Sequence, residues 1–131
     1  MKAVALVLLA TCALPAIAQT ACPAAGEVAQ SHLLGTWRAE VEGRGPAMLL
    51  LDKHPEYAQS ISGRLDRGDR RSQVAGDVED GELTLEESAD GVHITATWLG
   101  DVVEGSCGRE VRGTWTLDGQ PTGFPFVLRK Q

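Results

Sequence analysis

The sequence has 131 residues, with 12 Lys and Arg against 18 Asp and Glu and a formal net charge of −6 at pH 7. This length is typical of a single domain. A chain this acidic gives no electrostatic basis for binding nucleic acid, and no pattern in it indicates insertion into an anionic bilayer.

Residues 1–18 are predicted to be a cleavable secretory signal peptide. Lys2 precedes an apolar run over residues 3–17, which ends in the small-residue pattern Ala16-Ile17-Ala18. The run is too short for a comfortable membrane span, which needs about 20 apolar residues; an uncleaved anchor is the alternative. We expect cleavage after Ala18 and a periplasmic or secreted product without a membrane span.

Signal removal leaves two of the three cysteines, Cys22 and Cys107. Two cysteines in an oxidising compartment usually pair, so we expect a disulfide between them. A metal or redox pair is the alternative, but the sequence has no CxxC spacing and no clustered histidines. The bond would tie the N-terminal segment to a late turn, and the chain-entropy model assigns it roughly 4 kcal/mol.

Residues 19–34 are predicted to be a lead-in that contains the only plausible helix of the chain. Pro23 suits a first helical turn and Gly35 suits a helix stop, whereas Gly26 and the shortness of the segment disfavour a stable helix. We therefore expect either a short helix or an extended segment.

Residues 35–131 are predicted to form the folded β-domain. Trp37, Ala39 and Val41 alternate with charged residues, and this period of two is typical of a half-buried strand. The same alternation returns at Ile61, Gly63 and Leu65; Val74, Gly76 and Val78; Leu83 and Leu85; Val92, Ile94, Ala96 and Trp98; and Val111, Gly113, Trp115 and Leu117. With Ala47–Asp52 and Phe124–Lys130, and with Asp-Gly and Gly-rich turns between the segments, the pattern predicts about eight strands.

Eight consecutive short strands must protect their edges, and closing the sheet on itself removes the edges altogether. We therefore predict an all-β fold, an antiparallel up-and-down β-barrel of about eight strands in which the first strand pairs with the last. A sandwich is the alternative. Gly-Thr-Trp occurs at residues 35–37 and again at 113–115. Each glycine shares a face with its tryptophan, so we expect it to permit tight curvature and to leave space for a neighbouring indole.

Gly35-x-Trp37 at the start of the first strand resembles the Gly-x-Trp start of lipocalins and the wider calycin group. The span from this motif to Lys130 is similar to barrel modules of secreted bacterial proteins. It is more distantly similar to periplasmic metalloprotease inhibitors, which begin with Gly-x-Trp and end in an apolar strand closed by basic residues. The resemblance implies a small barrel that binds apolar ligands or proteins.

Two groups of residues could carry binding. The first is the set of large aromatics expected inside the barrel: Trp37, Trp98, Trp115, Phe124 and Phe126. The interior of an eight-stranded barrel is just filled by side chains or admits one small ligand, so a packed core is the alternative.

The second group is the arginine turn, in which Arg64, Arg67, Arg70 and Arg71 crowd the segment RLDRGDRR. We expect it to face an acidic hairpin from Asp77 to Glu87. It would be either an ion-paired surface hairpin of small energetic effect or a basic loop at the barrel rim that grips an anionic partner.

No catalytic residue, metal site or cofactor is predicted. His32, His54 and His93 are scattered, and no serine has a nucleophile-elbow context. The carboxylates Asp77, Glu79, Asp80, Glu82, Glu86 and Glu87 are assigned to the solvent face of one hairpin. We expect a monomeric, non-enzymatic binding module for a small apolar ligand or a periplasmic or secreted protein. One alternative is an inhibitor or immunity-type protein whose residues 19–34 block an enzyme such as a protease; the other is a small barrel enzyme.

Overall fold

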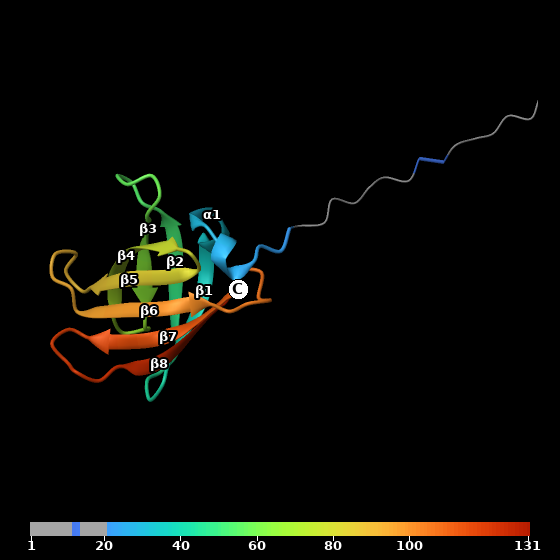
Figure 1. Ribbon diagram of the computed structural model, residues 1–131. Coiled ribbons are helices and arrows are strands. Elements are labelled where there is room, and N and C mark those ends of the chain that lie inside the picture. The colour runs from blue at the N-terminus through green and yellow to red at the C-terminus, as the bar shows by residue number, and fades with distance from the viewer. Residues whose placement is uncertain (1–11, 14–20) are drawn as a thin grey trace, which may run out of the picture.

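The computed structural model describes residues 12–13 and 21–131 (Figure 1). The predicted signal peptide therefore lies outside the described residues, apart from Cys12 and Ala13. The strands are β1 (Gly35–Val41), β2 (Ala47–Lys53), β3 (Ile61–Asp66), β4 (Arg71–Glu79), β5 (Glu82–Ser88), β6 (Ala96–Val102), β7 (Glu110–Leu117) and β8 (Phe124–Lys130).

The eight strands form one closed antiparallel barrel in simple up-and-down order. Each strand pairs with the next in sequence, and β1 closes the barrel on β8, with Trp37 opposite Lys130 and Val41 opposite Phe126. The predicted barrel is confirmed and the sandwich alternative is wrong. Every strand has two partners, so the sheet has no exposed edge that could pair with another chain.

The lead-in closes one end of the barrel. It contains a 3-10 turn, η1 (Ala25–Glu27), and a single helical turn, α1 (Gln30–Leu33). The indole Nε1 of Trp37 donates a hydrogen bond to the Leu33 carbonyl at 2.8 Å, and the Lys130 Nζ donates to the His32 carbonyl at 2.7 Å. The C-terminus consequently lies beside the lead-in (Figure 1).

The disulfide between Cys22 and Cys107 is confirmed. It joins the lead-in to the β6–β7 connection, residues 103–109, at the same end of the barrel. A disulfide fits an oxidising compartment such as the periplasm or the extracellular space. Within residues 12–13 and 21–131, no helix is long and apolar enough to cross a membrane.

The inward positions of the strands form the core, as their alternation predicts. The largest fully buried side chains include Trp37, Trp98, Phe126, Leu49, Leu85 and Leu128. The Trp98 ring packs edge-on against Phe126, with 5.0 Å between centroids, and against Trp115, with 6.3 Å. These aromatic contacts fill much of the space that an eight-stranded barrel encloses.

The β5–β6 loop, residues 89–95, contradicts one predicted strand segment. Val92 and Ile94 were expected to point inward, but their exposed fractions are 80% and 42%, and β6 begins only at Ala96. The carboxylate of Asp90 explains the difference, because it accepts hydrogen bonds from the backbone N–H groups of Val92 and His93 at 2.8 and 2.7 Å. Such local bonds compete with strand pairing.

The glycines of the two Gly-Thr-Trp triplets serve curvature, but they do not make room for an indole. A Cβ added at Gly113 would overlap the Leu99 carbonyl oxygen and the Gly100 Cα. At Gly35 the nearest atom is the Lys130 Cε, at 3.3 Å. The neighbouring backbone and a lysine stem therefore occupy the space that we expected an indole to fill.

Candidate functional site

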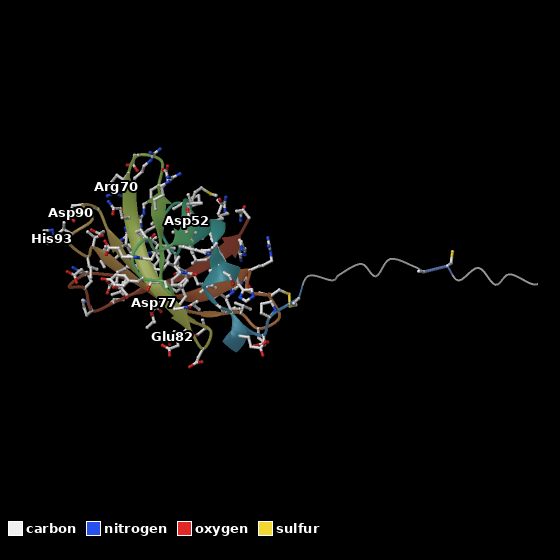
Figure 2. All side chains as sticks on the ribbon, turned by 90° about the horizontal axis from the view of Figure 1, so that it is seen from above. Asp52, Arg70, Asp77, Glu82, Asp90 and His93 are labelled. Carbon is white, nitrogen blue, oxygen red and sulfur yellow. A yellow bond between two sulfur atoms is a disulfide. The ribbon has the colours of Figure 1, made fainter. Side chains whose placement is uncertain are left out.

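The antiparallel order places the β1–β2, β3–β4, β5–β6 and β7–β8 loops at the end of the barrel opposite the lead-in. The arginine turn is centred on the β3–β4 loop, residues 67–70, which lies at this end. In Figure 2, Arg70 lies on a different side of the barrel from Asp77 and Glu82. The candidate site lies at the end of the barrel that carries the arginine turn.

A cavity of about 310 Å³ opens between these loops and is called the arginine pocket below. Its volume is at the lower end of the range of small-molecule sites. Its lining residues are Arg44, Arg67, Arg70, Arg71, Ser72, Glu87, Ala89, Thr95, Ala96, Trp115 and Leu117. Four of these eleven residues are arginines and only one is acidic, so a locally positive site forms on an acidic chain.

The floor of the pocket is built around the Glu87 carboxylate, which is only 3% exposed. Its Oε2 accepts hydrogen bonds from the indole N–H groups of Trp98 at 3.0 Å and Trp115 at 3.2 Å. The Arg67 guanidinium donates to both carboxylate oxygens, at 3.1 Å from Nη2 to Oε2. A buried charge is tolerated when it is paired and hydrogen-bonded in this way.

Glu87 is ionised at neutral pH. Burial acts to raise its pKa, but the hydrogen bonds from Arg67, Trp115 and Trp98 and the charge of Arg67 outweigh burial and leave the pKa below its ordinary value. An ionised carboxylate is an acceptor only. Glu87 therefore fixes the positions of one guanidinium and two indoles and has no proton to donate.

Arg44, from the β1–β2 loop (residues 42–46), covers the outer face of Trp115. Its guanidinium carbon lies 4.4 Å from the Trp115 ring centroid and 5.5 Å from that of Phe124. Within residues 21–131, no carboxylate lies within 4.0 Å of the Arg44 guanidinium. A guanidinium stacked on an indole is a cation–π contact, and at exposed positions this contact is weak.

The other three arginines of the pocket each have an acidic neighbour. Arg67 pairs with Glu87. The Arg71 Nε lies 3.2 Å from the Asp66 carboxylate, and the Arg70 Nε lies 3.9 Å from the Asp69 carboxylate. The last two pairs involve largely exposed arginines, so solvent screens them strongly.

The structure brings three of the four arginines of the predicted turn together. Arg67, Arg70 and Arg71 line the pocket, whereas Arg64 is exposed on the outer wall of β3, beside Gln73. Of the expected acidic hairpin, Asp77 to Glu87, Glu87 faces the turn and pairs with Arg67, whereas the tip of the hairpin does not face the turn. Strand β4 runs from Arg71 to Glu79, and eight steps at about 3.3 Å per residue place Glu79 roughly 26 Å from Arg71.

The five predicted aromatics do not form one site. Trp37 lies at the lead-in end, Trp98 and Phe126 pack in the core, and Trp115 lines the arginine pocket. Phe124 is 37% exposed, with its ring centroid 6.2 Å from that of Trp115. Trp115 is therefore where the aromatic group and the arginine turn meet.

Among the charged residues of the pocket, sequence reasoning missed Glu87 and Arg44. Glu87 was assigned to the solvent face, which is wrong. Leu83, Leu85 and Glu87 share one phase of β5, and the structure buries all three, so strict alternation would have found the inward glutamate. Arg44 stands in a glycine-flanked turn, Gly43-Arg44-Gly45, and no periodic signal marks it.

The histidines lie apart from the pocket lining. His93 lies in the β5–β6 loop, where its Nδ1 is 2.7 Å from the Asp90 carboxylate. In the part of the chain that the structure describes, no group of three or more His, Cys, Asp and Glu side chains is arranged to hold a metal ion.

No protein-family model and no curated protein significantly matches this chain.

Proposed function

We propose that this protein is a non-enzymatic binding module that takes a small anionic ligand with an apolar body into the arginine pocket. The observation that carries the proposal is the convergence of four arginines and the Trp115 indole around one cavity of about 310 Å³. The arginines would attract and hold the anionic group, and the indole and Leu117 offer apolar surface. A mostly apolar wall with a few polar groups is typical of small-molecule sites.

The chemistry of the pocket favours binding over catalysis. Its lining includes no histidine, cysteine or lysine. The one carboxylate, Glu87, is ionised and accepts four hydrogen bonds, so both of its oxygens are occupied. General acid–base work needs a group that can exchange a proton with the substrate.

An inhibitor or immunity-type protein is the second candidate, favoured by the anchoring of the lead-in. The Cys22–Cys107 bond and the hydrogen bond from Lys130 to the His32 carbonyl hold residues 22–34 against the barrel end opposite the pocket. An anchored segment loses less freedom on entering a cleft than a free tail does. This candidate predicts that deleting Gln19–Ala21 weakens capture of a partner enzyme at least tenfold without changing ligand binding in the pocket.

The proposal is tested by calorimetric titration of the protein with decanoate, an anion with an apolar body. The double variant Arg70→Ala plus Arg71→Ala should bind decanoate at least tenfold more weakly, and added salt should weaken wild-type binding. Arg64→Ala is the matched control, because Arg64 stands on the same hairpin but outside the pocket. Equal losses in both variants, or no binding of small anions at all, would overturn the proposal.

A further inference from the structure

The outer face of the Trp115 ring has a different kind of neighbour from its other sides. On its other sides this ring meets Trp98, at 6.3 Å between centroids, and Phe124, at 6.2 Å. Both are ring neighbours held by strands. The outer face is instead covered by the guanidinium of Arg44, whose residue is exposed and stands at the tip of a turn.

The Arg44 side chain can leave this face without moving its backbone. The turn is fixed by hydrogen bonds from the Arg44 N–H to the Val41 carbonyl at 3.0 Å and from the Glu42 N–H to the Pro125 carbonyl at 2.9 Å. Within the described chain, however, no carboxylate holds the guanidinium, and an exposed cation–π contact is weak. A change of side-chain rotamer is therefore enough to uncover the indole.

The indole presents its face and not its N–H to a ligand. The Trp115 Nε1 already donates to Glu87, and Glu87 is held by Arg67. This chain of bonds fixes the plane of the ring. A flat ring suits this place best, because the guanidinium that it replaces is planar and aromatic faces favour offset-stacked rings.

From these contacts we propose that the ligand is a planar aromatic carboxylate. Its ring takes the place of the Arg44 guanidinium on Trp115, and the displaced guanidinium pairs with its carboxylate. Arg44 is then the residue that selects for charge and shape together, because its planar fork matches a carboxylate through two parallel hydrogen bonds. This inference rests on the proposed function and names the ligand class of the same pocket.

The test compares three ligands by calorimetric titration: 2-naphthoate, 2-naphthalenemethanol and decanoate. The second has the same ring system without the charge, and the third has the charge without the ring. We expect 2-naphthoate to bind at least tenfold more tightly than either of the others. Arg44→Ala should remove this advantage, and Arg44→Lys should restore little of it, because an ammonium lacks the planar fork.

Two controls keep the outcomes distinct. Arg64→Ala should leave all three affinities unchanged, and the melting temperature of Arg44→Ala should equal that of the wild type, since the residue is exposed. If decanoate binds as tightly as 2-naphthoate and Arg44→Ala changes neither, the planar-ligand proposal is wrong while the anion pocket stands. If neither anion binds, both proposals fall.

Discussion

At the scale of single residues, the Glu87 carboxylate organises the loop-bearing end of the barrel. It is buried among two indoles and a guanidinium and is fully hydrogen-bonded. Such an arrangement contributes little to stability in comparison with apolar packing, but removing one partner is costly because the other charge stays behind. Glu87 is therefore a sensitive position whether or not a ligand is bound.

Replacing Glu87 with Gln should destabilise the protein by about 3 kcal/mol, because Arg67 loses its partner and the indole N–H groups lose a charged acceptor. Urea denaturation measures this change. Glu86→Gln is the matched control: it removes the same charge from the neighbouring exposed residue and should change stability by less than about 0.5 kcal/mol. Similar losses in both variants would show that the Glu87 network has no special role.

Acidification should narrow the difference in unfolding free energy between wild type and Glu87→Gln. The folded-state pKa of Glu87 is below the ordinary glutamate value of 4.5. As the pH falls, the Glu87 carboxylate is therefore protonated in the unfolded chain before it is protonated in the folded protein. Its stabilisation is complete above the ordinary pKa and is lost as the pH falls through the folded pKa. Urea titrations from about pH 6 to pH 3 should show that the difference in unfolding free energy between the two proteins is constant near pH 6 and becomes smaller below pH 4.5. A difference that stays constant over the whole range would contradict the lowered pKa.

At the scale of elements, glycines on the inward phase allow neighbouring strands to approach closely. A Cβ at Gly76 on β4 would overlap the carbonyl oxygen of Thr84 on β5, and one at Gly63 on β3 would overlap that of Leu50 on β2. In each case the obstacle is backbone, which cannot rotate away as a side chain can. These positions let a narrow barrel bend and close.

Gly76→Ala should therefore destabilise the barrel by about 2 kcal/mol, in the range of overpacked cores. Gly26→Ala is the control, because a Cβ there meets nothing within 4 Å. The comparison uses thermal or urea unfolding of both variants. Unchanged stability of Gly76→Ala would mean that the strands can separate without loss.

At the scale of the whole molecule, the two ends of the barrel carry different structural features. The lead-in, the C-terminus and the disulfide lie at one end, and the arginine pocket lies at the other. The core packed between them, with Trp98 and Phe126, is buried. A substitution at one end should therefore affect the other end only by changing the stability of the whole barrel.

Replacing both Cys22 and Cys107 with Ser should lower the unfolding free energy by up to about 4 kcal/mol, because the bond joins residues 85 positions apart. Binding of 2-naphthoate should stay unchanged at a temperature where the variant is folded. Unfolding and calorimetric titration of the same sample check both statements. A tenfold loss of affinity in the folded variant would show that the two ends are coupled.

Local patterns in the sequence were sufficient for the architecture. Period-two alternation gave the strand faces, the turn residues separated the strands, and the need to remove edges favoured closure. The even cysteine count that is expected if the predicted signal peptide is removed predicted the pair Cys22 and Cys107. Each of these features depends on neighbouring residues or on simple counting, which the sequence contains.

Arg67, Arg70 and Arg71 already stand together in the sequence, but the rest of the arginine pocket was decided by tertiary structure. Arg44 and Trp115 are 71 positions apart in sequence, and only barrel closure through β1 and β8 brings the β1–β2 loop over β7. The same closure sends Asp77 and Glu82 to the opposite end, whereas Glu87 of the same hairpin lies beside Arg67. Composition and alternation determine which side chains a strand buries, but the meeting of distant loops depends on register and closure, which no local pattern records.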